Sequence, residues 1–163
     1  MTTIQQLFDR DISRQIQEVI KVDQQDDAVV ISEIEEYVAT DAIKRSFASV
    51  LEAYAEVPNK PRDRMAVWVS GFFGSGKSSF AKLLGAAVGN RDLQGKSASK
   101  RVADQFGDGR VSVVLERISQ RMPTEVVIFD LATDAGVRNA NQKLTEIIYR
   151  QLLEHLGYAR DLD

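Results

Sequence analysis

The chain has 163 residues, of which 44% are apolar and 28% charged, with a formal net charge of −3 and no cysteine. This composition is typical of a soluble globular protein, and the length favours one compact domain. The absence of cysteine excludes a disulfide framework and a thiolate metal site, which fits the cytoplasm. The longest unbroken apolar run covers only residues 65–69. A membrane-spanning helix needs about 20 apolar residues, so we expect no membrane span.

Charge divides the chain into two regions. Residues 1–64 carry 8 Lys and Arg against 13 Asp and Glu, whereas residues 65–163 carry 13 against 11. We predict that residues 1–64 form a helical leader or interaction region and that residues 65–163 have a different role. A polar, proline-containing connector at 58–64 separates them.

Two amphipathic helices are predicted before the connector. The longer one starts at Thr40 or Asp41, whose side-chain oxygen can accept from first-turn amides, and ends before Pro58. A shorter helix precedes it, with Asp26 or Asp27 as its cap. The residues predicted to face inward are Val30, Ile34, Tyr37 and Val38 in the shorter helix and Ile43, Phe47, Val50, Leu51 and Tyr54 in the longer one.

The pattern then changes from helical to β. Residues 65–69, M-A-V-W-V, form a continuous apolar run that is typical of a strand buried on both faces of a parallel sheet. A loop follows at 71–76, and apolar residues at helical spacing predict a helix over 77–88. Residues 125–130, E-V-V-I-F-D, predict a second buried strand. Strands that alternate with helices indicate an α/β fold with a parallel sheet.

Three further segments are predicted from weaker patterns. Residues 91–110 show little periodicity and are predicted to be mostly loop, with a short helix over 98–106. Residues 111–122 form a helix that Pro123 ends. The last helix begins at Asn139 or Asn141 and closes at Gly157.

One motif in the chain carries recognisable chemistry. Residues 71–78, G-F-F-G-S-G-K-S, satisfy the P-loop pattern G-x-x-x-x-G-K-[ST]. Glycines let successive backbone N–H groups point at one anion, and the N-terminus of the following helix adds a partial positive charge. Lys77 can then reach the β- and γ-phosphates, and the Ser78 hydroxyl can bind Mg²⁺. The predicted ATP-binding residues are Gly71, Gly74, Ser75, Gly76, Lys77, Ser78 and Ser79, with Lys77 as the catalytic residue.

A magnesium-dependent ATPase also needs an acidic residue on a neighbouring strand. Asp130 follows four apolar residues and is the candidate, but Leu131 stands where a second, catalytic acid is expected. The alternative is that Asp130 ends its strand near the site without binding metal. Asp134 is a weaker candidate, with a cap or turn as its other explanation.

Several other features have structural explanations that we favour over functional ones. Trp68 and the pair Phe72 and Phe73 could stack on a base. We expect instead that Trp68 fills the core and that the two phenylalanines pack against the sheet or a neighbouring subunit. His155, the single histidine, is predicted to be an exposed surface residue. The basic cluster at 96–101 is predicted to be a solvated loop, and contact with DNA is the alternative.

The chain resembles a known family at several places. Residues 4–12, 20–24, 36–40 and 67–78 together resemble the start of the BrxC/PglY family, the large P-loop ATPases of BREX bacteriophage-exclusion systems. The resemblance is strongest over residues 4–90 and extends through 125–130 and the helix after it. The string W-V-S-G-F-F-G-S-G-K-S at 68–78 is far more specific than a bare P-loop. The family commonly has His-Phe after the P-loop serine, whereas this chain has Ser79-Phe80, so any role of that side chain is in doubt.

The resemblance has consequences beyond the motif. It implies an AAA+-like P-loop NTPase core, present only in part over residues 65–163, because family members are much longer and would carry the Asp-Glu strand beyond residue 163. It implies ATP and Mg²⁺ as cofactors and a homo-oligomeric full-length ATPase. Other BREX proteins, such as BrxB and PglZ, are the implied partners in blocking phage DNA replication while the host chromosome is methylated.

Two other functions compete with this one. The chain has about the length of a complete small nucleotide or metabolite kinase, although the 64 residues before the P-loop strand argue against a kinase. Alternatively, the acidic residues 1–64 form a protein-interaction or assembly module that the P-loop merely accompanies. Nucleotide binding with hydrolysis would favour the kinase, and no nucleotide binding at all would favour the module.

Overall fold

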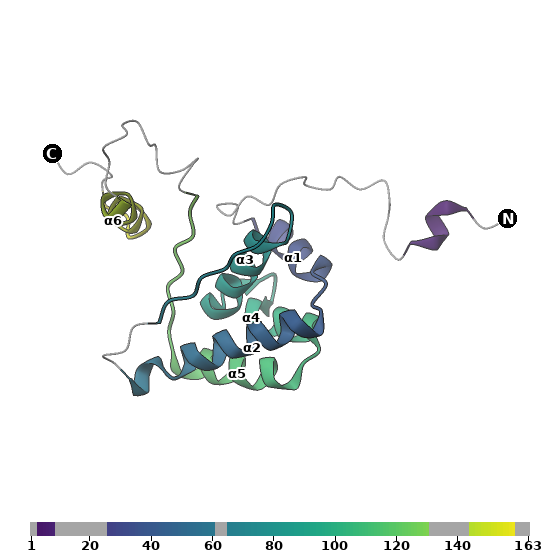
Figure 1. Ribbon diagram of the computed structural model, residues 1–163, viewed down its shortest axis with the longest axis horizontal. Coiled ribbons are helices and arrows are strands. Elements are labelled where there is room, and N and C mark those ends of the chain that lie inside the picture. The colour runs from purple at the N-terminus through teal and green to yellow at the C-terminus, as the bar shows by residue number, and fades with distance from the viewer. Residues whose placement is uncertain (1–2, 9–25, 61–64, 131–143, 159–163) are drawn as a thin grey trace.

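The computed structural model describes residues 3–8, 26–60, 65–130 and 144–158, and most of them are helical (Figure 1). The α-helices are α1 (Asp27–Glu36), α2 (Asp41–Ala55), α3 (Lys77–Gly89), α4 (Ala98–Phe106), α5 (Gly109–Arg121) and α6 (Leu144–His155), with short 3₁₀ helices η1 (Ile4–Leu7) and η2 (Val57–Asn59). The strands β1 (Asp92–Leu93) and β2 (Lys96–Ser97) form an antiparallel pair, in which Asp92 lies opposite Ser97.

The two helices expected before the connector are confirmed, with the caps that local chemistry predicts. The Asp26 carboxylate accepts from the backbone N–H groups of Ala28 and Val29, at 3.0 and 3.2 Å. Thr40 caps α2 by accepting from the N–H of Ile43 at 3.4 Å. Among the residues predicted to face inward, the prediction is wrong only for Val38. It is 79% exposed because α1 ends at Glu36 and the next residue is already extended.

The segment expected to be mostly loop at 91–110 is more regular than predicted. The helix over 98–106 is confirmed as α4, but a tight hairpin precedes it and α5 begins at Gly109. Gln94 and Gly95 connect the two strands with φ angles of +54° and +81°, the positive signs that a type I′ turn requires at both central residues. Asparagine is the usual first residue of such a turn. Because Gln94 stands there instead, the sequence did not predict the hairpin.

Helices α1 to α5 share one hydrophobic core. The Phe47 ring of α2 lies 4.5 Å from the Phe106 ring of α4, measured between centroids, and meets Phe80 of α3 edge-on at 5.4 Å. Tyr37 stacks on Phe106 at 5.8 Å. This core draws on residues from both sides of position 64. The other large, fully buried side chains are Ile34, Leu51, Leu93, Val102, Val111, Leu115 and Ile118.

The prediction of a parallel sheet is wrong. Residues 65–70 and 123–130 are extended, but neither segment is a strand, and the only sheet within the described residues is the β1–β2 pair. Trp68, predicted to fill the core, is 91% exposed. A strand needs hydrogen bonds from a neighbouring strand, so β-propensity alone cannot make these segments into a sheet. The fold is therefore a helical bundle rather than the sheet core of a P-loop NTPase.

The segment 123–130 packs against a helix instead of a strand. Val126 and Ile128 lie over the small residues Gly85 and Gly89 of α3, so close that a Cβ added to Gly85 would be 2.7 Å from the Ile128 side chain. The Tyr54 hydroxyl lies 2.8 Å from that of Thr124. From there the chain runs towards α6, which stands apart from the other helices (Figure 1).

The last described helix, α6, covers part of the stretch predicted to be helical after residue 139. Gly157 follows it with a φ of +80°, as the predicted closing residue requires. The two predicted caps, Asn139 and Asn141, lie outside the described residues. Within the part of the chain that the structure describes, no helix combines the length and apolar character needed to cross a membrane.

Candidate phosphate-binding site

The glycine-rich segment forms a tight turn that leads from the extended residues 65–70 into α3. The N–H of Ser75 donates to the carbonyl of Phe72 at 3.2 Å and closes the turn. Gly74 and Gly76 have φ angles of +75° and +81°, which L-residues with a Cβ adopt only at a cost. The glycines of the motif are therefore required by the backbone path as well as by any ligand.

Gly71 lies close to the other end of the turn. A Cβ added there would lie 2.6 Å from the Ser75 hydroxyl oxygen, closer than non-bonded atoms approach. The two ends of the turn thus meet at Gly71, and the loop curls over itself before α3 begins.

The N-terminus of α3 carries no side-chain cap. Gly76 is its N-cap, and the first backbone bond of the helix is that from the Phe80 N–H to the Gly76 carbonyl, at 2.9 Å. The N–H groups of Lys77, Ser78 and Ser79 precede that bond and have no acceptor within the helix. Amides in this position, together with the helix dipole, favour an anion.

Lys77 contributes a positive charge to the same turn. Its Nζ donates to the Phe72 carbonyl at 2.7 Å, an exposed contact within the loop, and its side chain is half-buried. The ammonium group therefore lies over the turn rather than in the core. A phosphate oxygen is a stronger acceptor than a neutral carbonyl and could replace it.

The structure brings the predicted ATP-binding residues together but not the predicted metal acid. Residues 71–79 form the turn and the first residues of α3, with Ser78 exposed. Asp130 is exposed at the far end of the segment 123–130. A cavity opens beside Lys77, and Asp130 does not line it. Asp134 lies outside the described residues. The described residues contain no cluster of three or more His, Asp or Glu that could hold a metal ion.

A cavity of about 450 Å³ opens beside this turn, and sequence reasoning missed it. Ser75, Gly76 and Lys77 form one part of its wall, and α2 contributes Ile43 and Ser46. No acidic residue is among the described residues that line it. The α2 residues stand about 30 positions before the motif, and no local sequence pattern indicates that they share a cavity with it. Only the fold brings them together.

The aromatic residues around the turn are exposed. Phe72 and Phe73 are 92% and 104% exposed, and Trp68 lines the cavity with 91% of its surface accessible. The prediction that the two phenylalanines pack against a sheet is wrong, since no sheet lies there among the described residues. Their packing against a neighbouring subunit stays a prediction.

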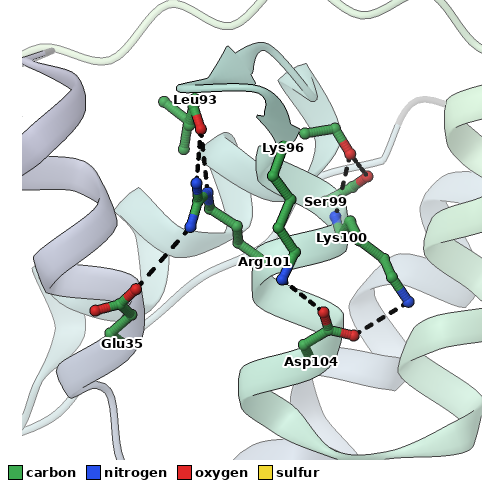
Figure 2. Close-up of polar contacts among 8 residues, drawn as sticks. Glu35, Leu93, Lys96, Ser99, Lys100, Arg101 and Asp104 are labelled. Atoms are coloured by element: carbon green, nitrogen blue, oxygen red, sulfur yellow. Dashed lines mark hydrogen bonds and ion pairs between the residues drawn. The ribbon is translucent and has the colours of Figure 1, made fainter.

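The basic residues at 96–101 contact other residues of the same chain (Figure 2). Lys96 and Lys100 both pair with Asp104, at 2.8 and 3.1 Å, and these hydrogen bonds, that of Lys96 first, lower the pKa of the Asp104 carboxyl. Arg101 donates to the Leu93 carbonyl at 2.8 Å and reaches Glu35 at 3.9 Å. These contacts connect the β hairpin, α4 and α1.

Two other titratable groups, His155 and Tyr37, lie outside the turn. His155, exposed as predicted, lies 3.3 Å from a carboxylate oxygen of Glu125. Burial raises the pKa of the Tyr37 phenol.

Comparison with known proteins adds no assignment. No family model matches the chain, and no solved structure matches it.

Proposed function

We propose that residues 71–79 bind the triphosphate of ATP together with Mg²⁺, and that the chain supplies the phosphate-binding part of a cytoplasmic ATPase. The observation that supports this proposal is one turn in which two glycines with positive φ, the uncapped N-terminus of α3 and the Lys77 ammonium group come together. Each of these features favours a polyphosphate, and all three lie within nine residues.

The roles of the residues follow from their chemistry. The N–H groups of the first turn of α3 donate to phosphate oxygens, and Lys77 provides charge for the β- and γ-phosphates. The Ser78 hydroxyl is a ligand for Mg²⁺, which neutralises charge on the triphosphate when it is bound. No acid is present among the described cavity residues to activate water, so this chain by itself should bind ATP without hydrolysing it efficiently.

The resemblance of residues 68–78 to the BrxC/PglY family supports a more specific proposal. In that setting the ATPase would act in BREX defence against bacteriophage, as a homo-oligomer with partners such as BrxB and PglZ. The Lys77→Ala variant should then abolish phage resistance in a bacterium that depends on this protein for it. Full resistance with the variant would contradict the defence assignment.

The first test is calorimetric titration of the chain with Mg-ATP, for the unaltered protein and for Lys77→Ala. We expect binding to be lost in the variant, with little change in the free energy of unfolding, because the Lys77 ammonium group makes its bond to an exposed loop carbonyl. Lys60→Ala, which removes an exposed lysine outside the turn, is the matched control and should bind normally.

Hydrolysis is followed in the same samples. We expect a turnover well below about 1 per second, the low end of the usual enzyme range. A turnover above that value would favour a complete small kinase or ATPase and restore Asp130 as the metal acid. Equal ATP binding by the unaltered protein and Lys77→Ala, or no binding at all, would contradict the phosphate site and favour an assembly module.

A further inference from the structure

A second cavity, of about 290 Å³, lies along the later turns of α3 and shares no lining residue with the cavity beside Lys77. Gly85 and Gly89 of α3 line it, together with Val126 and Ile128, which lie over these glycines. Its volume is close to the lower limit of small-molecule sites. It is therefore a space for a compact ligand, separate from the proposed ATP site.

One side of this second cavity is apolar. Its apolar side chains are Val30 of α1, Ala86 of α3, and Val126 and Ile128 of the segment 123–130. The segment lies so close to the helix that a Cβ added to Gly89 would be 2.9 Å from the Val126 side chain. A wall of this kind favours a hydrocarbon group, because burying it removes apolar surface from water.

Basic side chains predominate among the charged residues of the lining. Lys82, Arg91 and His155 line the cavity, whereas Glu125 is the one acidic residue among the described residues that do so. Lys82 is only 5% exposed, and an ammonium group in such a place is costly unless an anion accompanies it. The charged groups of the lining thus favour an anion over a cation.

Two acidic residues hold these cations from outside the cavity. Lys82 Nζ donates to a Glu33 carboxylate oxygen at 2.8 Å, and Arg91 Nη1 lies 3.1 Å from an Asp27 carboxylate oxygen. Neither acid is among the described residues that line the cavity. Glu33 neutralises Lys82. A guanidinium group has five N–H donors, so Arg91 can pair with Asp27 and with a second carboxylate at once.

The acid that does line the cavity lies in solvent. The Glu125 side chain is 86% exposed, and its carboxylate lies 3.3 Å from the His155 ring. Water and salt screen the charge of an exposed carboxylate. Glu125 therefore opposes a bound anion only weakly, which leaves Arg91 as the anchor for one.

We infer that this cavity binds a small carboxylic acid with an apolar body, whose carboxylate pairs with Arg91 and whose hydrocarbon part lies against Val126 and Ile128. The inference does not depend on the ATP site, because the two cavities have no lining residue in common. It also accounts for a buried Lys82–Glu33 pair beside a cavity, since ion pairs of this kind add little stability by themselves.

The test compares three probes by ligand-observed NMR titration of the chain: 4-methylpentanoate, 4-methylpentan-1-ol and acetate. We expect 4-methylpentanoate to bind about tenfold more tightly than either of the others, because the alcohol lacks the charge and acetate lacks the hydrocarbon. Equal binding of the alcohol would show that Arg91 does not recognise a carboxylate. Equal binding of acetate would show that the apolar wall does not contribute. Either result contradicts the site.

Variants test the anchor. Arg91→Gln should weaken binding of 4-methylpentanoate about tenfold and leave binding of the alcohol unchanged. Arg117→Gln is the matched control, since Arg117 pairs with Glu56 at 3.2 Å and its side chain is 42% exposed, against 3.1 Å and 41% for Arg91. Glu125→Gln removes the acidic charge of the lining and should tighten binding of the carboxylate.

The outcomes also separate this site from the ATP site. Lys77→Ala should bind 4-methylpentanoate normally, so either proposal can fail while the other stands. Selective loss in Arg91→Gln supports the carboxylate site. The site is wrong if the unaltered chain shows no saturable binding of 4-methylpentanoate, or if Arg91→Gln binds it as tightly as Arg117→Gln does.

Discussion

Gly74 and Gly76 illustrate how the backbone restricts single residues in this protein. Their φ angles are +75° and +81°, yet nothing lies within 4 Å of where a Cβ would stand. The restriction is therefore conformational and does not come from crowding. At Gly71 the reverse holds, because a Cβ there would meet Ser75.

Gly76→Ala should lower the free energy of unfolding by about 1 kcal/mol, the cost of a left-handed conformation for an L-residue. Gly109→Ala, at the start of α5 with open space around it and no positive φ, is the matched control and should cost nothing. Urea denaturation of both variants measures the difference. Equal stability of the two would contradict the conformational explanation.

Asp104 shows how a residue can depend on its charged neighbours. Its carboxylate accepts from Lys96 and Lys100 (Figure 2), and these hydrogen bonds lower its pKa. A group whose pKa is lower in the folded state stabilises the fold above its unfolded pKa. That stabilisation disappears as the pH falls through the folded pKa.

Asp104→Asn should therefore be less stable than the unaltered protein at pH 7, and the difference should shrink as the pH falls through the folded pKa of the Asp104 carboxyl. Lys96→Met removes the first of the two donors and should reduce the same pH dependence. Urea denaturation at several pH values measures both effects. A stability difference between Asp104→Asn and the unaltered protein that stayed constant across this range would show that the ion pairs do not cause it.

Among the elements, α3 has two functions that its sequence separates along its length. Its first turn carries the amides that we propose to bind phosphate, whereas Gly85 and Gly89 form a flat surface for Val126 and Ile128 in its second half. Small residues at i and i+4 lie on one face of a helix, which lets the extended segment 123–130 approach closely.

Gly85→Leu should displace this segment from α3 and destabilise the protein by about 1–3 kcal/mol, as overpacking does. Leucine is a better helix former than glycine, so the helix itself should not suffer. Ala81→Leu, at an exposed position of the same helix, is the control. Urea denaturation should show the loss of stability in Gly85→Leu but not in Ala81→Leu, and equal stability of the two variants would contradict the packing.

At the scale of the whole molecule, one core joins residues on both sides of the predicted boundary at 64. Phe47 of α2 contacts Phe80 of α3 and Phe106 of α4. The acidic first region therefore does not pack by itself: α1 and α2 complete the bundle formed with α3 to α5. The same arrangement places α2 beside the glycine-rich turn before α3 and creates the cavity between them.

The sequence by itself determined the features that depend on a few neighbouring residues. Asp26 and Thr40 cap the helices that their positions predict, and the glycines, lysine and serine of the motif predict the turn before α3. The hairpin at Gln94 and Gly95 escaped prediction because its turn uses a less usual residue.

Only the tertiary structure decided what the two apolar extended segments do. Residues 65–69 and 125–130 have the composition of buried strands, but a strand exists only where a distant segment supplies hydrogen bonds. Here residues 125–130 pack on α3, whereas residues 65–69 line a cavity and leave Trp68 exposed. The caps and the turn are encoded within a few residues, whereas a sheet or a shared cavity depends on which distant elements meet.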